Sequence, residues 1–407
     1  MTTNKEQSPV VPSVPRVPSA FGNASDREPV GRCRDEFPTL RDGAYLLSHS
    51  LGPVPRAAAD SMADYVRQWG GQTSEDAWAS QWWELSSRVG DLYGSIIGAP
   101  GGSVLPTPNA TLAMATIASC LSYEERPKIV TSGLDFPSMG YLWDAQRRLG
   151  AEIHVVPSDD GVHLDEGRLF DAIDERTCLV AISHVSYRSS HRVDAAAVVR
   201  RAHDVGALAL LDVYQSAGVV EIDAKAWGID LLVGGSIKWL CGGPACGYLY
   251  VRPDLIETLE PGLTGWIAHE NPFAFAPDGI AYDATIRRFA NGTPGIPSLY
   301  SVMPGMEIVS KVGVASIARE SRRRTQRIVE CALERGWPLN SPRDAARRGG
   351  TVMLAFNDPE RFAQRLRERR VFVDWRPDVG IRISPHFFNT DDEIDQALAI
   401  ISELAGD

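Results

Sequence analysis

One lysine stands in the sequence where a solvated surface amine is unexpected. Lys238 lies within the glycine-rich segment 234–244, shortly after the apolar run Leu231–Val233. Glycines allow a ligand to approach the backbone closely, and a lysine that is shielded from water has a lowered pKa. Such an amine can attack a carbonyl carbon and form a Schiff base. Lys238 is therefore the candidate nucleophile of this chain.

Few other amines compete for this role. Only five of the 41 basic residues are lysines, so the chain offers four alternatives to Lys238. Lys5 lies in a proline-rich start, and Lys128, Lys225 and Lys311 lie at the edges of predicted elements. Lys238 alone has an apolar strand before it and glycines on both sides.

A carboxylate follows another apolar strand. Asp212 comes directly after the run Ala207–Leu211, and Gln215 stands three residues later. A carboxylate at a buried strand end is costly unless a cation lies beside it. Asp212 is thus a candidate counter-ion for a bound cationic group, and a helix N-cap or a structural ion pair is the alternative.

A third polar feature precedes a predicted helix. Asn109, Ala110 and Thr111 lie just before the helix expected at 112–121. Free backbone N–H groups and the helix dipole favour a phosphate at such a place, although similar residues also cap most helices. A phosphate site, a buried carboxylate and a Schiff-base lysine are together what pyridoxal 5′-phosphate (PLP) requires. The three features therefore predict a PLP site.

The elements that must position these residues follow an α/β pattern. Amphipathic stretches predict helices at 112–121, 138–149 and 194–205 between the apolar runs. This alternation is typical of a mostly parallel sheet flanked by helices, whose ligands bind at the carboxyl ends of the strands. The strands are expected at 103–106, 128–132, 152–156, 178–183, 208–212, 231–234 and 247–251.

The pattern changes near residue 305. Thr390-Asp-Asp-Glu393 has the spacing of a capping box and predicts the start of a final helix. Three parts follow: a disordered proline-rich tail (1–30), a large α/β domain (31–304) and a smaller α+β domain (305–407). The other elements of the smaller domain are expected as a long helix at about 306–335, a helix at 359–369, and strands at 351–356, 371–374 and 381–384.

Composition excludes several classes of protein. Apolar residues make up 44% and charged residues 23%, as in ordinary soluble domains. The net charge of −11 argues against a general affinity for nucleic acid or for an anionic membrane. No apolar run reaches about 18 residues, so no membrane-spanning helix is expected. The six cysteines lack CxxC spacing, which predicts neither a metal site nor a disulfide framework and fits the cytoplasm.

From about Tyr45 to the C-terminus, the sequence resembles the class V aminotransferase family of fold-type I PLP enzymes. Within this family it is most similar to the kynureninases. The resemblance implies that family's fold, PLP as cofactor, and a homodimer in which each subunit completes the other's active site. The motifs that carry it are Asp212-Val-Tyr-Gln215, Lys238 with the following Gly-Gly-Pro244, Tyr45-Leu-Leu-Ser-His-Ser-Leu-Gly52, Phe136-Pro-Ser138, Gly265-Trp-Ile-Ala-His269, Arg287-Arg-Phe-Ala-Asn291 and Gly380-Ile-Arg-Ile-Ser-Pro385.

The resemblance also implies roles for single residues. Lys238 would carry the cofactor and Asp212 would pair with its ring nitrogen. Phe136 would stack on the ring, Gln215 would hydrogen-bond near its phenolic oxygen, and Arg382 would grip the substrate carboxylate with its fork of donors. The remaining positions are, for the cofactor and its phosphate, Asn109, Ala110, Thr111, Ser236, Trp266, Asn291 and Thr293, and, for the substrate, Ser50.

His184 is a separate candidate. It follows the strand expected at 178–183, so its side chain could reach the same rim of the sheet. It is a candidate general acid or base, and a polar residue that merely ends the strand is the alternative.

The implied activity is that of an enzyme on an L-α-amino acid: a kynureninase-like lyase or hydrolase that cleaves a side-chain bond through a quinonoid intermediate. Two positions depart from the kynureninase pattern, Ile237 in place of a tyrosine and Gln215 in place of a histidine. A class V aminotransferase or a C–S lyase-type enzyme is therefore the alternative, and a non-catalytic PLP-binding member is a third. Cys331 lies on the apolar side of a predicted helix, which disfavours persulfide transfer.

Overall fold

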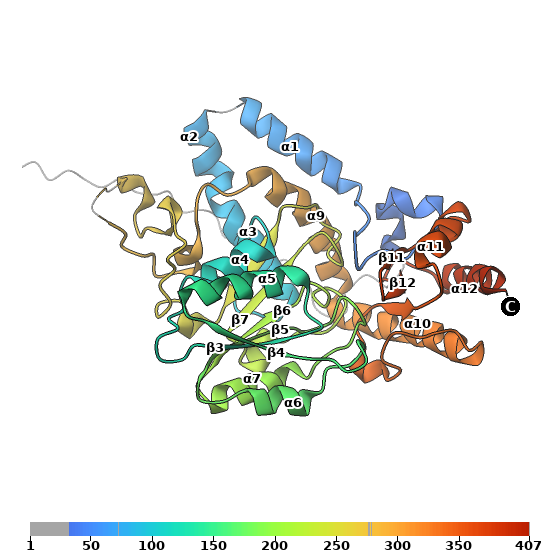
Figure 1. Ribbon diagram of the computed structural model, residues 1–407. Helices are drawn as coiled ribbons and strands as arrows, with labels where there is room; N and C mark the ends of the chain where they lie inside the picture. The colour runs from blue at the N-terminus through green and yellow to red at the C-terminus, as the bar shows by residue number, and fades with distance from the viewer. Residues whose placement is uncertain (1–31, 72, 276, 278, 407) are drawn as a thin grey trace, which may run out of the picture.

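The computed structural model describes residues 32–406 except 72, 276 and 278, so the predicted tail (1–30) lies outside the described residues. Within this part, the large domain is built on a seven-stranded sheet of order β2-β8-β7-β6-β5-β3-β4 (Figure 1). The strands are β2 (Val104–Thr107), β3 (Lys128–Ser132), β4 (Glu152–Val156), β5 (Thr177–Ser183), β6 (Leu208–Asp212), β7 (Leu231–Gly235) and β8 (Gly247–Val251).

Strand direction brings three strand ends to one edge of the sheet. Strands β4, β3, β5, β6 and β7 run parallel, and β8 is antiparallel to β7. Strand β2 is antiparallel to β8, so two reversals restore the direction of β7. Thr107 at the end of β2 therefore lies opposite Gly247, which lies opposite Gly235 at the end of β7. The mostly parallel sheet predicted from the sequence is confirmed.

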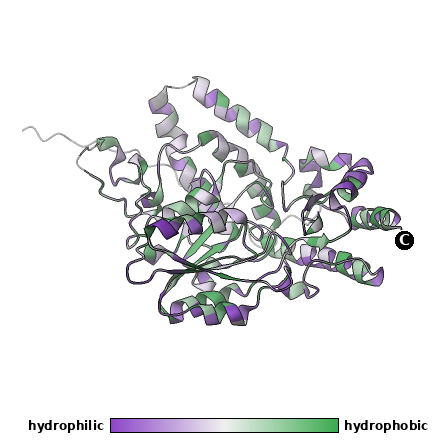
Figure 2. Cartoon of the chain, viewed as in Figure 1, coloured by the Kyte–Doolittle hydropathy of each residue, from purple (hydrophilic) through white to green (hydrophobic). Residues whose placement is uncertain are grey.

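Both faces of this sheet are covered. Along β5 and β6, neighbouring residues belong to opposite cores: Leu179 and Leu210 pack on one face, and Val180 and Leu211 on the other. The first core includes helices α4 (Ala110–Ala118) and α5 (Pro137–Ala145), and the second includes α7 (Ala195–Asp204), which lies beside α6 (Glu166–Ala172) in Figure 1. Figure 2 shows the central strands coloured as hydrophobic, as expected for strands buried on both sides.

Further helices pack around the sheet and carry the chain towards the second domain. The long helices α1 and α9 lie side by side at the top of Figure 1. Inside α9, Gly305 approaches the carbonyls of Leu240 and Cys241 so closely that a Cβ there would lie 2.4 Å from both oxygens. Helix α9 therefore packs directly on the segment that follows Lys238. The bounds are α1 (Ala57–Gly71), α2 (Ser74–Ala77), α3 (Trp83–Ile96), α8 (Ala224–Trp227) and α9 (Ile296–Val312).

The smaller domain has its own core. A three-stranded antiparallel sheet of order β11-β12-β9 packs with helices α10 and α12, and the capping box at Thr390 is confirmed. Strand β1 (Ala44–Tyr45) pairs with β10, so an N-terminal segment also joins this core. The elements are α10 (Val314–Glu334), β9 (Val352–Leu354), α11 (Pro359–Glu368), β10 (Val371–Phe372), β11 (Asp374–Arg376), β12 (Gly380–Ile383) and α12 (Asp391–Ala405).

The single helix predicted at about 306–335 is wrong. The structure has two helices there, because Gly313 adopts φ 85°, a left-handed conformation that ends α9 and starts α10. The expected division between residues 304 and 305 falls inside α9. Among the described residues, no helix has both the length and the apolar character that crossing a membrane requires.

Candidate active site

A cavity lies where the ends of β6 and β7 meet the start of α4. Its volume is about 760 Å³, including the part that opens to solvent. Fourteen side chains line it, and half of them are candidates from the sequence. These seven are Asn109, Ala110, Thr111, Phe136, Asp212, Gln215 and Lys238.

Lys238 reaches the cavity from the turn after β7. Its Nζ lies 4.4 Å from the ring centre of Tyr214 and 5.8 Å from that of Phe136. Burial lowers the pKa of Lys238 to about 8; the Asp212 charge opposes this shift, and Arg382 adds to it. The neutral amine is therefore far more populated near physiological pH than in an ordinary lysine, as a nucleophile or proton carrier requires.

Asp212 ends β6, the strand next to β7, and lines the same cavity. The carboxylate is 8% exposed, and its Oδ1 accepts a hydrogen bond from the Tyr214 amide at 2.8 Å. Burial raises its pKa, and among the described residues no cationic nitrogen lies within 4.0 Å of it. The Lys238 charge, which lowers the pKa of Asp212, acts only from beyond that distance. A buried carboxylate with no cation in direct contact fits a ligand that brings its own positive charge, such as a protonated pyridine nitrogen.

The start of α4 offers backbone donors. Asn109 caps the helix through Leu112, whose amide donates to Oδ1 at 2.9 Å. The amides of Ala110 and Thr111 lie in the first turn of α4, where N–H groups have no acceptor inside the helix. At Gly247 a Cβ would lie 2.4 Å from the Asn109 carbonyl carbon, so only glycine lets β8 pass this close. The geometry fits a phosphate, and together with Lys238 and Asp212 it fits PLP.

Gln215 connects the cavity with the N-terminal segment. Its Nε2 donates to the carbonyl of His49 at 3.1 Å, and its Oε1 accepts from Trp239 Nε1 at 3.1 Å. Nearby, the Gly52 amide donates to the Ile237 carbonyl at 2.7 Å, which holds the segment against the lysine turn. Ser50 lies in the same segment but does not line the cavity.

Arg382 is buried and already holds a carboxylate. Its Nε and Nη2 donate to the two oxygens of Asp374 at 2.8 and 2.6 Å. His49 Nε2 donates to the same carboxylate at 2.7 Å, and Ser384 donates to His49 Nδ1. These donor assignments take His49 as neutral, since burial lowers its pKa to about 4. Burial would raise the pKa of Asp374, but its contacts with His49 and Arg382 hold it below the usual range.

Asp374 and His49 are functional-site neighbours that the sequence analysis missed. Asp374 stands directly opposite Arg382 in the antiparallel pair of β11 and β12. Neighbouring cross-strand positions with opposite charges are a recognisable sign of such a pair. An assignment of the hairpin register would therefore have found Asp374, whereas His49 reaches it from 325 residues away.

Two candidates point elsewhere. His184 is buried, its Nδ1 lies 3.0 Å from Ser216 Oγ, and its ring meets Trp227 edge-on. Burial lowers its pKa to about 3, and it is not among the residues that line the Lys238 cavity. Ser236 is fully buried, and its hydroxyl donates to the carbonyl of Gly243 at 2.8 Å, inside the lysine turn.

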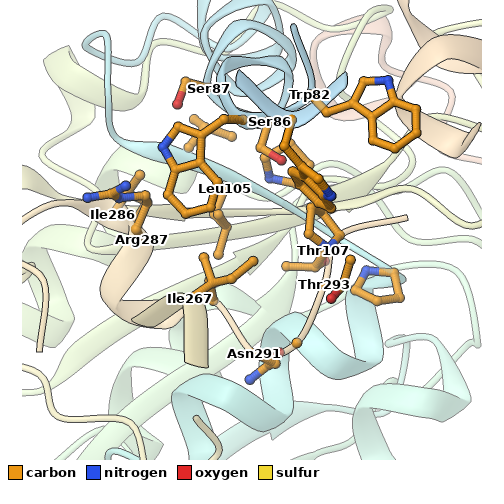
Figure 3. A pocket seen from close by; sticks show the side chains of 18 residues that line it. Trp82, Ser86, Ser87, Leu105, Thr107, Ile267, Ile286, Arg287, Asn291 and Thr293 are labelled. Atoms are coloured by element: carbon orange, nitrogen blue, oxygen red, sulfur yellow. The ribbon is translucent and has the colours of Figure 1, made fainter. Parts of the chain in front are cut away.

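Three further candidates gather around a second pocket, shown in Figure 3. Asn291 and Thr293 line it together with three tryptophans of the α2–α3 region, and it encloses about 810 Å³ including its open part. Trp266 packs beside it, 6.4 Å from the ring of Trp83. Within one subunit, these three residues do not line the Lys238 cavity.

Comparison with known proteins identifies the family. The family model for aminotransferase class-V matches residues 44–396. The chain is 31% identical to the uncharacterized aminotransferase YcbU of Bacillus subtilis, over 90% of this chain and 95% of that one. It is 30% identical to a kynureninase of Pseudomonas fluorescens, over 91% of each chain. A cysteine desulfurase from Thermococcus onnurineus NA1 has a similar fold, with a TM-score of 0.82 and 23% identity over 92% of this chain and 97% of that one.

The chain therefore belongs to the class V aminotransferase family, and it is a PLP-dependent enzyme of fold type I. The family and the cofactor expected from the sequence are confirmed. The relatives carry different activities in their names, so the family leaves the reaction open.

The lowered pKa of Lys238 leads to a prediction about amine labelling. In protein stripped of PLP, acetylation of Lys238 by acetic anhydride should reach half its maximal rate near pH 8, because only the neutral amine reacts and burial lowers the pKa of Lys238 from 10.5 to about 8. Mass spectrometry of the Lys238 peptide measures this rate, and the exposed Lys225 in the same sample corrects for loss of reagent. A Lys238 profile still rising steeply above about pH 9.5 contradicts the shift.

The Arg382–Asp374 pair leads to a prediction about stability. Asp374→Asn should lower the free energy of unfolding by about 3–5 kcal/mol, because it leaves the buried Arg382 charge without its carboxylate. Asp254→Asn is the matched control, since the carboxylate of Asp254 pairs with Arg252 but is 65% exposed. That control should cost at most about 1 kcal/mol. Urea unfolding of both variants measures the difference, and equal losses would show that the buried pair is not special.

Proposed function

We propose that this enzyme acts on an L-α-amino acid and cleaves a bond in its side chain, as a kynureninase-like lyase or hydrolase. The observation that carries the proposal is the meeting of Lys238, Asp212 and the start of α4 around one cavity. Its similarity over most of its length to proteins named kynureninase supports the type of reaction.

The residues of this chain then have the following roles in the reaction. PLP, when bound, supplies an electron-withdrawing ring that stabilises negative charge at the substrate Cα. Lys238 binds the cofactor through its amine and later moves the Cα proton, which its lowered pKa allows. Asp212 keeps the ring nitrogen protonated, because its negative charge stabilises the protonated, positively charged form of a neighbouring base.

The walls of the cavity orient the cofactor and the substrate. Phe136 and Tyr214, both within 6 Å of the lysine Nζ, bound the space in which the ring must lie. The amides of Ala110 and Thr111 bind the phosphate. Arg382 does not itself line the cavity, but its Nη1 donates to the carbonyl of Tyr187, which does, at 3.4 Å. Because Asp374 accepts from Nε and Nη2, Nη1 is the nitrogen of Arg382 through which it binds the substrate carboxylate.

An aminotransferase is the second candidate, favoured by the similarity to YcbU. Both reactions begin with removal of the Cα proton, so the Lys238 cavity serves either one. The cysteines argue against persulfide transfer: after Lys238, Cys241 and Cys246 are buried with raised pKa values, and Cys331 lies within α10. A thiol nucleophile needs a lowered pKa and access to the substrate.

A product assay separates these reactions. The holoenzyme is incubated with L-kynurenine and with a panel of L-amino acids, with and without a 2-oxo acid. Release of alanine or pyruvate without the 2-oxo acid supports side-chain cleavage, whereas amine transfer that requires the 2-oxo acid supports an aminotransferase. Lys238→Ala should abolish product formation, and Asp212→Asn should lower kcat by more than about tenfold because a neutral amide no longer favours the protonated ring. Full turnover in Asp212→Asn contradicts its assigned role.

We also propose that the enzyme is a homodimer with shared active sites. Phe273 and Phe275 are 58% and 73% exposed and form an aromatic cluster with Trp266. An exposed aromatic cluster marks a surface that a partner can cover. Because a two-fold interface is self-complementary, a second copy of this chain can cover it. In that arrangement Trp266, Asn291 and Thr293 complete the partner's phosphate site.

Mixing two inactive variants tests the shared site. Lys238→Ala lacks the nucleophile, and Trp266→Ala should lose PLP more readily than it loses its fold. A hybrid dimer has one site with both wild-type residues, so an equimolar mixture after subunit exchange should regain about a quarter of the wild-type activity. Light scattering and a tag exchange assay confirm that hybrids form. Hybrids without activity, or a fully active monomer, overturn the shared site.

A further inference from the structure

A small cavity between the two domains is lined by three arginines. Arg192 comes from the segment between β5 and α7 of the large domain, Arg322 from α10, and Arg348 from the segment before β9. Its enclosed part has room for about one water-sized particle. The cavity lies apart from the Lys238 cavity, with which it shares no lining residue.

In the part of the chain that the structure describes, these three arginines have no carboxylate partner. Among the residues that the structure describes, no carboxylate oxygen lies within 4.0 Å of Arg192, Arg322 or Arg348. The neighbouring Arg347, by contrast, pairs with Glu166. Asp194, Asp344 and Glu330 act on Arg192 or Arg348 only from a longer distance. The cavity thus gathers positive charge that the protein itself does not neutralise.

Burial makes this charge costly. Arg348 is 4% exposed, and burial lowers its pKa to about 10. Burial also lowers the pKa of Arg192, and the charges of Arg322 and Arg347 add to that shift. Of the three, only Arg348 is buried, while Arg192 is half-buried and Arg322 is exposed. A buried cation without a counter-charge is strongly unfavourable, so Arg348 in particular calls for an anion.

Two buried polar atoms at the cavity lack a hydrogen-bond partner. They are the hydroxyl oxygen of Ser321, a residue that is 3% exposed, and Nε of Arg348. The other donors of Arg348 are used: Nη1 by the carbonyls of Pro342 and Arg343, and Nη2 by Gln326. A free hydroxyl and a free guanidinium N–H beside one small cavity are suitable donors for an anion.

The frame around the cavity is fixed by backbone contacts between the domains. The Arg192 amide donates to the Arg347 carbonyl at 2.8 Å, and the Gly349 amide donates to the Ser190 carbonyl at 2.8 Å. His191 and Arg348 form a β-bridge between these two contacts. The backbones of Arg192 and Arg348 are therefore held close together, and Nη2 of Arg192 donates to the Ala346 carbonyl at 2.5 Å.

We propose that this cavity binds a halide-sized anion, with chloride as the physiological form, held by Ser321, Arg192, Arg322 and Arg348. The anion neutralises charges from both domains and so links them. A monatomic anion suits this small space, which opens partly to solvent. This site is independent of the reaction performed at Lys238.

Anomalous scattering from bromide tests the site directly. Crystals of the holoenzyme are grown in sodium bromide and, as a control, in sodium gluconate, whose anion is too large for the cavity. An anomalous peak between Ser321 and Arg348 in bromide supports the proposal. Absence of this peak, at a bromide concentration where other halide sites on the same molecule are occupied, overturns it.

Thermal unfolding provides the second test, in solution. Replacing gluconate by chloride at constant ionic strength should raise the Tm of the holoenzyme by roughly 1–3 °C. The double variant Ser321→Ala/Arg322→Gln should lose this gain, while Arg200→Gln, which removes an exposed arginine of α7 outside the cavity, should keep it. Equal Tm values in chloride and gluconate, or an unchanged gain in the double variant, contradict the proposal. Should the double variant not fold, the bromide experiment on the unaltered protein decides alone.

Discussion

The site depends on two charged groups that the fold removes from water without letting them touch. Asp212 and Lys238 lie at neighbouring strand ends of one sheet, yet no ion pair joins them. Burial acts on both in opposite senses, raising the pKa of the carboxyl group and lowering that of the amine. A ligand that is cationic at one end and carries a carbonyl group at the other offsets the free-energy cost of burying both the carboxylate and the amine. The bound cofactor therefore stabilises the fold as well as supplying chemistry.

Much of this arrangement could be predicted from the sequence, for a physical reason. Strands buried on both faces appear as continuous apolar runs, so the bounds of β3, β6 and β8 agree with the expected ones. The bounds of β4 agree as well, although this edge strand is mostly exposed. Asp212 stands out because it follows such a run directly, and Lys238 because it follows one shortly afterwards, among glycines. The orientation of His184 was harder to foresee, since a side chain just beyond a strand can turn to either side of the sheet. It faces Ser216 and Trp227 instead of the cavity.

Features that depend on contacts between distant parts of the chain were missed. The break at Gly313 leaves no signal in the apolar pattern, because a helix lies on each side of it and only this one residue separates α9 from α10. Asp374 and His49 came to light only in the structure, where strand pairing and the packing of residues 44–52 bring them to Arg382. Local pattern thus explains the nucleophile and its counter-ion, and tertiary packing explains how the carboxylate-binding arginine is held.

The pairing of the two chain ends has a consequence for synthesis. Strand β1 can pair only after β10 has been synthesised, and His49 can bond to Asp374 only after that residue has been made. Arg34 pairs with Glu393, which lies 359 residues further along the chain. While the ribosome is still making the last hundred residues, the sheet of the large domain is available to fold, but the N-terminal segment has an unpaired edge and apolar side chains without a core. The nascent enzyme therefore passes through an aggregation-prone stage late in translation, and C-terminally truncated products, which never acquire β10 to α12, remain in it.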